Sequence, residues 1–384
     1  MWGRMVGLVH VDFNLTNACN LACSHCHSAS GKALANELTT SEIISAVTDL
    51  HEMGVLSIAL AGGEPFMRPD LLEILSAACS LDGWQVSVIT NGLFLTPSTL
   101  DRLGSCCPGL VMNVSVDGSN PDTFSELRAQ PRATPAAKAA LFRRVTEGVR
   151  AAAKAGLQVS VNTTMTRASI HDLVPTYQLA IDELGARAVV AIKFFPAGYG
   201  REHLDRYEFP ATVWAEEFQR LTRAKLAGEL PALQLSLPSA WEFYLPLVQG
   251  GFDVAGAERA WRNSSPLRQP GYAAHRSLGD VAGVTELCVA GDGSLYPSVL
   301  MVGDRRMLAG SLRDRPVRDT WRDSAVLARL RGLTLADIDG GCASCPAAAL
   351  CGGGSRSRAL AEHGRIDAAD SACPLIVERE RVGV

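Results

Sequence analysis

The chain has 384 residues, 47% of them apolar and 20% charged, and its formal net charge is −4. This length and apolar content allow a sizeable core and more than one domain. The slightly acidic balance and the absence of a dense Lys/Arg run argue against nucleic acid as a partner. The N-terminal sequence lacks the apolar segment of a signal peptide, and no later stretch is long enough to span a bilayer. We therefore expect a soluble, cytoplasmic protein that does not contact membranes.

Strand-like runs alternate with helical periodicity as far as about residue 200, which is typical of βα units around a parallel sheet. The predicted strands cover residues 7–14, 56–60, 85–90, 110–116, 158–164 and 188–195. After the first strand and its loop, Thr39 and Glu42 form the capping box of a helix that ends at Gly54. A longer helix runs to about residue 155 and has Leu141, Val145, Val149 and Ala152 on one face. We expect these apolar stripes to belong to the core.

The loop after the first predicted strand contains Cys19, Cys23 and Cys26 in the run CNLACSHC. Four sulfur donors normally complete an iron–sulfur cluster, so three suggest a cluster with one iron open to a small molecule. A zinc knuckle or a chance grouping is the alternative. Zinc needs four ligands, and the sequence places none of the next three cysteines near this loop: Cys79, Cys106 and Cys107.

Polar and glycine residues follow the other predicted strands, where the chemistry of such barrels lies. Glycines allow a backbone to approach a ligand, and a carboxylate can accept hydrogen bonds from an ammonium group. Taken singly, each of these residues could equally belong to an ordinary turn. In chain order they are Gly62, Gly63, Glu64 and Pro65 after strand two, Asn91 after strand three, Ser115 and Asp117 after strand four, Asn162 and Thr164 on strand five, and Gly198 and Gly200 after strand six.

The Cys-x3-Cys-x2-Cys loop followed by GGEP resembles the radical S-adenosylmethionine (SAM) enzymes. This resemblance implies an α/β fold, a partial (β/α)6 TIM barrel, with a [4Fe–4S] cluster on Cys19, Cys23 and Cys26. SAM would bind the open iron through its amino and carboxylate groups, and its reductive cleavage would give a 5′-deoxyadenosyl radical that abstracts hydrogen. The resemblance further implies SAM contacts from Gly62, Gly63, Glu64, Pro65, Asn91, Ser115, Asp117, Asn162 and Gly198.

Residues 201–284 differ in character from the barrel and are predicted to bridge residues 1–200 to a third domain, residues 285–384. Aromatic side chains punctuate this bridging region. They could cover the barrel mouth or grip a substrate, but buried packing is the commoner role of such residues. They are Trp214, Trp241, Phe243, Tyr244 and Trp261.

A second cysteine array lies in the third domain, with Cys342, Cys345, Cys351 and Cys373 preceded by an isolated Cys288. Eleven cysteines, an odd number with seven at ligand-like spacings, favour metal ligation over a disulfide framework. Zinc is the alternative to iron for the quartet, because four-cysteine zinc sites are common. Cys288 alone is better interpreted as a buried thiol than as a ligand.

This array resembles the SPASM extension of radical SAM enzymes, in which seven cysteines help to hold two auxiliary clusters. Ser298 and Ser355 stand where two of those cysteines would be, and serine is a poor substitute for thiolate on iron. The resemblance therefore implies one auxiliary [4Fe–4S] cluster on Cys342, Cys345, Cys351 and Cys373, with the inner cluster absent.

The segment CNLACSHCHSASGK is similar to mycofactocin maturases, and the YPS turn with CGGGSRSRA is similar to enzymes of haem d1 and alternative haem synthesis. We predict a radical SAM/SPASM oxidoreductase that crosslinks a ribosomally synthesised peptide, forms a thioether in it or decarboxylates it. A porphyrin, sugar or other small-molecule substrate is one alternative. A non-catalytic iron–sulfur electron-transfer or scaffold protein is an alternative of another class.

The resemblance implies a flavodoxin- or ferredoxin-type electron donor beside the substrate peptide. The cysteine loop starts too early for a leader-binding domain to precede it, which argues against a peptide substrate. A separate leader-binding protein could compensate for that absence. Asp117 and Asp292 are acid/base candidates by position alone, and solvated turn residues are the simpler interpretation of both.

Overall fold

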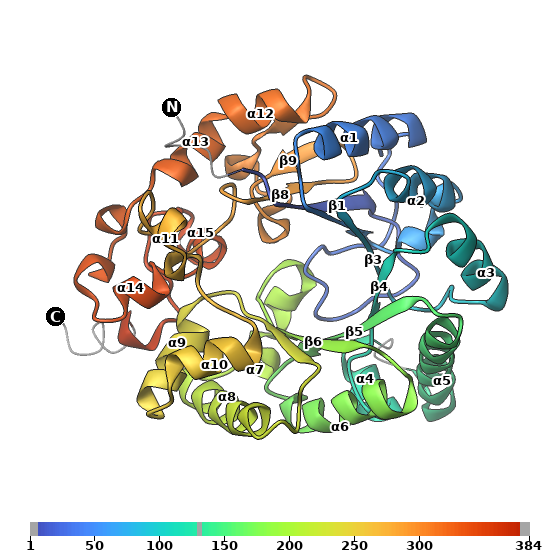
Figure 1. Cartoon of the computed structure of the whole chain (residues 1–384), viewed down its shortest axis with the longest axis horizontal. Coiled ribbons are helices and arrows are strands. Elements are labelled where there is room, and N and C mark those ends of the chain that lie inside the picture. Colours follow the sequence, from blue (N-terminus) through green and yellow to red (C-terminus); the bar gives the residue numbers. More distant parts are fainter. Residues whose placement is uncertain (1–6, 129–132, 377–384) are drawn as a thin grey trace.

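The computed structural model describes residues 7–128 and 133–376. Within them, one ten-stranded sheet has the order β10-β9-β8-β1-β2-β3-β4-β5-β6-β7, and Figure 1 shows helices around its outside. The strands are β1 (His10–Thr16), β2 (Ser57–Gly62), β3 (Gln85–Thr90), β4 (Val111–Ser115), β5 (Gln158–Met165), β6 (Ala188–Lys193), β7 (Leu233–Ser236), β8 (Glu286–Val289), β9 (Ser294–Tyr296) and β10 (Gly310–Ser311).

All six predicted barrel strands are present as β1 to β6, and each pairs in parallel with the next. This arrangement confirms the α/β fold with parallel βα units. The helices are α1 (Thr40–Glu52), α2 (Leu71–Cys79), α3 (Pro97–Cys106), α4 (Pro121–Arg128), α5 (Pro135–Lys154), α6 (Leu173–Gln178), α7 (Leu204–Tyr207), α8 (Ala211–Leu226), α9 (Trp241–Gln249), α10 (Val254–Trp261), α11 (Pro270–Ala273), α12 (Val317–Asp323), α13 (Ala325–Gly332), α14 (Ala348–Cys351) and α15 (Arg356–His363).

Local sequence signals explain where the two predicted helices begin and end. The Thr39–Glu42 capping box is formed at the start of α1. Gly54 and Gly156 follow α1 and α5 with φ of +80° and +82°, a conformation that glycine adopts without strain. The predicted stripe on α5 is in the core, because Val145, Val149 and Ala152 are buried and Leu141 packs against them.

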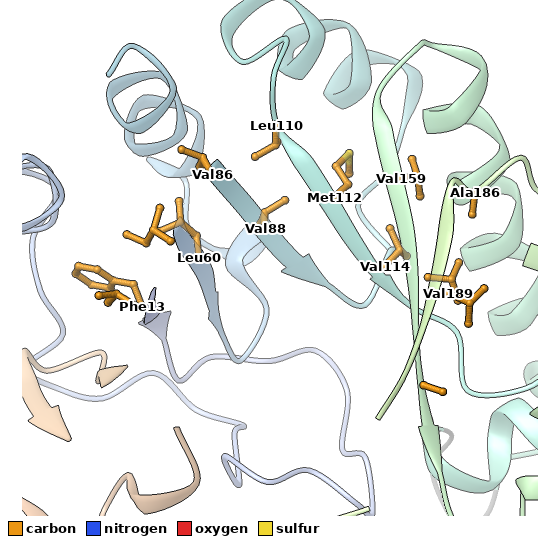
Figure 2. Close-up of a cluster of buried hydrophobic side chains, with 14 of the residues drawn as sticks. Phe13, Leu60, Val86, Val88, Leu110, Met112, Val114, Val159, Ala186 and Val189 are labelled. Atoms are coloured by element: carbon orange, nitrogen blue, oxygen red, sulfur yellow. The ribbon is translucent and has the colours of Figure 1, made fainter. Parts of the chain in front are cut away.

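The two faces of each strand have different neighbours, because successive side chains of a strand alternate. Outward-facing residues such as Phe13, Leu60, Val88 and Val114 are fully buried in a core between sheet and helices (Figure 2). Inward-facing residues of the same strands, among them Asp12, line a cavity. The sheet therefore stabilises the fold with one face and presents chemistry on the other.

Two strands outside the predicted barrel extend its sheet at both sides. β7 comes from the predicted bridging region and pairs in parallel with β6, and β8 comes from the predicted third domain and pairs in parallel with β1. Sequence reasoning missed both because each has only four residues. The sheet continues across residues 200 and 284. The division into 1–200, 201–284 and 285–384 stays a prediction, and the first and last residues of the chain lie outside the described residues.

The five aromatic residues predicted to punctuate region 201–284 are buried, which confirms that they pack inside the protein. Their exposed fractions are at most 3%, and one of them, Trp214, stacks on Phe218 with the ring centroids 5.6 Å apart. Phe243 and Tyr244 also reach the wall of the barrel cavity. No helix in the described part of the chain has the length and apolarity needed to cross a membrane.

We predict that Leu60→Ala lowers the free energy of unfolding by about 3 kcal/mol, because it leaves a hole in a fully packed core. The measurement is the urea midpoint of the purified protein. Leu56→Ala is the control, since Leu56 is 60% exposed and its loss should change stability by less than about 0.5 kcal/mol. Equal losses in the two variants would contradict the packing described here.

Candidate active site in the barrel and a second cysteine site

The cysteine loop begins where β1 ends, and hydrogen bonds close it at its base. The backbone N–H of Cys19 donates to the Gly31 carbonyl at 2.9 Å, and that of Gly31 donates to the Asn17 carbonyl at 2.9 Å. The Glu37 carboxylate accepts from the Asn17 backbone at 2.7 Å and from Thr16 Oγ1 at 2.9 Å. The two ends of the loop are therefore held together independently of any metal.

A cavity of about 750 Å³ brings most of the predicted site residues together. Parallel strands end at the same edge of a sheet, so loops distant in sequence meet there. Its wall includes Cys19, Cys23 and Cys26 together with Gly62, Gly63, Asn91, Ser115, Asn162 and Thr164. Four further predicted SAM residues lie outside this wall: Glu64, Pro65, Asp117 and Gly198.

The two glycines of GGEP are required by a close approach between the β2 turn and the cysteine loop. A Cβ at Gly62, where φ is +120°, would lie closer than 3.0 Å to the Thr16 carbonyl, and one at Gly63 would collide with the Ala18 carbonyl. Backbone N–H groups of Gly63 and Glu64 donate to these carbonyls at 2.7 and 2.8 Å. The glycines therefore fix the loop as well as lining the cavity.

Glu64 is completely buried beneath the cavity wall, and its carboxylate is used by neighbouring groups. It accepts hydrogen bonds from Thr90 Oγ1 at 2.8 Å, from the Asn91 backbone at 2.8 Å and from the Phe66 backbone at 3.1 Å. Burial raises the pKa of Glu64, and these hydrogen bonds oppose it. The carboxylate joins β2 to the end of β3, and contacts of Glu64 and Pro65 with SAM stay predictions.

Asp117 is buried, with 2% exposure, so its interpretation as a solvated turn residue is wrong. Its carboxylate accepts from Arg128 Nε and from the Thr164 backbone at 2.6 Å, and it lies 3.6 Å from His25 Nε2. Burial alone would raise the pKa of Asp117, but Arg128 and His25 together hold it below its ordinary value. Asp292, by contrast, is half-buried, accepts a hydrogen bond within its own turn and lies outside the cavity wall.

Arg128 is a site residue that sequence reasoning missed, because no motif surrounds it. It lines the cavity, and its Nη1 lies 4.0 Å from Cys23 Sγ. Burial raises the pKa of the Cys23 thiol to about 11, and the charge of Arg128 opposes that rise. Since iron binds the thiolate form, Arg128 favours the form of Cys23 that a cluster needs.

Within the described residues, two buried polar atoms in the cavity wall have no hydrogen-bond partner, Oδ1 of Asn162 and Nδ1 of His25. A buried group without a partner calls for an explanation, and a ligand in the cavity would supply one. Together with three thiols on one wall, these atoms fit a three-thiolate cluster with SAM beside it. In residues 7–128 and 133–376, no three His, Cys, Asp or Glu side chains form a single-ion site, and the cluster assignments remain predictions.

Gly198 supports the cysteine loop from the β6 side. Its φ is +52°, and a Cβ there would lie closer than 3.0 Å to the carbonyls of Cys26 and His27. The next residue, Tyr199, donates its backbone N–H to the Cys26 carbonyl at 3.0 Å. Backbone packing thus explains this glycine, and its contact with SAM stays a prediction.

The four cysteines of the C-terminal array line one small cavity, Cys342, Cys345, Cys351 and Cys373. Burial raises the pKa of Cys351 to about 12 and that of Cys373 to about 11. Cys351 also belongs to the wall of the barrel cavity, so this one residue borders both sites. The four cysteines thus share one cavity wall, although the described side chains do not form a single-ion site, and a cluster on them stays a prediction.

The two serines at expected cysteine positions act as helix caps. Ser355 Oγ accepts from the Arg358 backbone at 3.2 Å at the start of α15, and Ser298 Oγ accepts from a backbone N–H two residues later at 3.4 Å. Cys288 is fully buried, as predicted, and Asn14 Nδ2 donates to its sulfur at 3.7 Å. The two cavity walls described here do not include Cys288.

A buried chain of ion pairs between the two cavities was also missed, because its members are spread over 178 positions of the sequence, from residue 193 to residue 370. Lys193 Nζ lies 2.7 Å from Glu242 Oε1, and Arg358 Nη2 lies 3.2 Å from the same oxygen. Arg358 Nη1 lies 3.0 Å from Asp370 Oδ1. These side chains are 0–3% exposed, so their charges are compensated inside the protein.

The structure joins Cys79 at the end of α2 to Cys107 just after α3 in a disulfide, with the Cα atoms 5.5 Å apart. Sequence reasoning missed this pair, since cysteines separated by 28 positions show no pairing signal. The bond lies in the outer layer of the barrel and involves none of the seven predicted ligand cysteines.

Residues 13–180 match the family model of the radical SAM superfamily, so this part of the chain is a radical SAM domain. The chain is 29% identical to the AdoMet-dependent heme synthase of Methanosarcina barkeri, over 92% of this chain and 93% of that protein. It is 28% identical to the PqqA peptide cyclase of Ruegeria pomeroyi, over 96% and 87%. It is 26% identical to the mycofactocin maturase MftC of Mycobacterium tuberculosis, over 94% and 82%.

The fold is similar to the crystal structure of Streptococcus suis SuiB bound to its precursor peptide SuiA. The TM-score is 0.73 at 16% identity, covering 96% of this chain and 76% of that one. This similarity confirms the predicted fold class, and the family match over residues 13–180 confirms the resemblance to radical SAM enzymes.

We predict that Asp117→Asn lowers stability at pH 7 by about 3 kcal/mol, because it leaves Arg128, whose side chain is only 11% exposed, without its carboxylate. The folded pKa lies below the unfolded value of 3.8, so the ionised pair stabilises fully above about pH 3.8 and loses this effect as pH falls through the folded value. Thermal unfolding at pH 7 and pH 3 measures the difference.

Asp122→Asn is the matched control for this variant, since the Asp122 side chain is 91% exposed and lies 3.9 Å from Lys138. Its effect should be small at both pH values. An Asp117→Asn variant that unfolds like the wild-type protein at pH 7 would contradict the buried pair.

Proposed function

We propose that this protein is a radical SAM oxidoreductase that modifies a ribosomally synthesised peptide, and that one auxiliary [4Fe–4S] cluster assists it. The observation that carries the proposal is the single cavity that gathers the three loop cysteines, the GGEP glycines and the unpartnered Asn162 Oδ1. When bound, the first cluster and SAM supply a one-electron cleavage that yields a hydrogen-abstracting carbon radical.

In this proposal the residues of the cavity divide the work of binding. Cys19, Cys23 and Cys26 hold the cluster, and Arg128 favours thiolate at Cys23. Gly62 and Gly63 present backbone to SAM, and Asn162 Oδ1 accepts a hydrogen bond from it. Asn91 and Ser115, both buried, complete the wall on the β3 and β4 side.

The charges of the cavity wall favour a peptide over a porphyrin. Among the described wall residues, only Arg128 and Lys193 carry permanent positive charge, and each is paired with a carboxylate, Asp117 or Glu242. Asp12 and Glu286 also line the wall, and burial with the nearby Asp12 raises the pKa of Glu286 to about 7. A porphyrin bearing several carboxylates would meet no unpaired lysine or arginine in the described part of this wall, whereas a neutral or basic peptide segment suits it.

Relatives of similar sequence identity to this chain support both substrate classes, peptides and porphyrins. The PqqA peptide cyclase at 28% and the SuiB fold with its precursor peptide point to peptides. The AdoMet-dependent heme synthase at 29% keeps an iron porphyrin as the second candidate. A non-catalytic scaffold is disfavoured, because three thiols beside a large cavity suit an open iron better than a closed cluster.

The auxiliary cluster is proposed for Cys342, Cys345, Cys351 and Cys373, and the inner cluster is proposed to be absent, since Ser298 and Ser355 serve as caps. The reaction further needs an electron donor of the flavodoxin or ferredoxin type, and a separate leader-binding protein is proposed for the peptide.

We predict that the anaerobically reconstituted protein cleaves SAM to 5′-deoxyadenosine and methionine, and that alanine at Cys19, Cys23 and Cys26 lowers this rate at least about 100-fold. Chromatography of the products after reduction with dithionite measures it. Alanine at Cys342 and Cys345 is the matched control and should retain SAM cleavage. Zinc without inorganic sulfide in the purified protein, or cleavage that survives loss of the triad, would refute the proposal.

We predict that short peptides encoded beside the gene change mass in the presence of enzyme, SAM and reductant, and that an iron porphyrin with free carboxylates does not. Mass spectrometry of both mixtures distinguishes the two substrate classes. The triad variant provides the baseline for each. Conversion of the porphyrin with unchanged peptides would establish the second candidate instead.

A further inference from the structure

The carboxylate of Asp370 receives more directed contacts than a structural turn requires. It accepts from Ser239 Oγ at 2.5 Å, from Trp241 Nε1 at 3.1 Å and from the Ser355 backbone at 2.9 Å. Arg358 Nη1 adds an ion pair with both of its oxygens, at 3.0 and 3.3 Å. Asp370 is 1% exposed, so all of these contacts are shielded from water.

Asp370 also lies beside the four-cysteine site. It lines the same small cavity as Cys342, Cys345, Cys351 and Cys373. Its carbonyl accepts the backbone N–H of Cys373 at 2.9 Å, and its side chain packs on Gly354, where a Cβ would collide with it. The carboxylate is therefore held in a fixed position beside the cavity that the four cysteines line.

Asp370 depends on one cation for the compensation of its charge. In the described part of the chain this cation is Arg358, which also pairs with Glu242, and Glu242 pairs in turn with Lys193. Burying four charges is unfavourable unless the pairs are well made. Hydrogen bonds from the backbone of Ser355 and from the start of helix α9 already hold the Asp370 carboxylate in place. Arg358 is therefore not needed as an anchor, and what it contributes is its positive charge.

We propose that Asp370 and Arg358 together set the reduction potential of the metal site formed by the C-terminal cysteines. This inference rests on the auxiliary iron–sulfur cluster of the proposed function. Both residues act through that cluster, so they are positioning residues rather than catalytic ones.

The direction of each effect follows from electrostatics. A reduced cluster carries one more negative charge than an oxidised one, and a buried carboxylate next to it disfavours reduction. Removing the charge of Asp370 therefore makes reduction easier and raises the potential. Removing Arg358 leaves the charge of Asp370 uncompensated and lowers the potential.

The experiment uses the full chain with Cys19, Cys23 and Cys26 replaced by alanine, so that only the C-terminal cluster is titrated. Redox titration followed by electron paramagnetic resonance gives its potential. We expect a positive shift in Asp370→Asn, a negative shift in Arg358→Gln, and a value close to that of the parent in Arg358→Lys. A purely structural role would move the first two variants in the same direction.

Two controls separate charge from packing. Ser239→Ala removes a hydrogen bond to Asp370 without removing charge. It should lower the unfolding temperature and leave the reduction potential close to that of the parent. Glu42→Gln removes the carboxylate of the exposed pair with Arg313 and should leave the potential unchanged. If Arg358→Gln does not fold, the comparison of Asp370→Asn with Ser239→Ala decides.

Shifts of equal sign in Asp370→Asn and Arg358→Gln, or shifts no larger than that of Glu42→Gln, would overturn the inference while leaving the auxiliary cluster intact. A parent protein without iron and sulfide at these cysteines would instead refute the cluster of the proposed function, and this inference with it.

Discussion

The cysteine loop keeps its shape because backbone from two other loops lies against it at distances that only glycine permits. Gly62 and Gly63 press on its N-terminal end, and Gly198 presses on the carbonyls of Cys26 and His27. Side chains at these positions would push the loop away from the ends of β2 and β6. The alignment of three thiols on one cavity wall thus depends on backbone packing between β1, β2 and β6.

Much of the fold could be predicted from sequence, because its signals are local and repeated. The strands β1 to β6 are apolar runs between turn residues, and the capping box at Thr39 marks its helix directly. The cysteine triad and GGEP were recognisable for the same reason, since all their members lie close together in the chain. Short strands such as β7 and β8 lack this signal, and their place in the sheet depends on tertiary pairing.

The part of the site that escaped prediction consists of charges that meet only in the folded protein. Arg128 reaches Asp117 and Cys23, and Arg358 reaches Glu242 and Asp370. Each of these residues looks like an ordinary surface charge in sequence, because burial and partner cannot be read from its neighbours. Asp117 was misjudged as solvated for this reason.

The pairing of β7 with β6 and of β8 with β1 has a consequence for how this protein can be divided. Each outer strand of the predicted barrel takes its neighbour from a later region of the chain. A fragment that stops at residue 200 would leave the sheet edges at β1 and β6 unpaired, and strands of other chains could pair with them. Exchange of C-terminal regions between relatives would therefore have to carry along strands that fit the edges of β6 and β1.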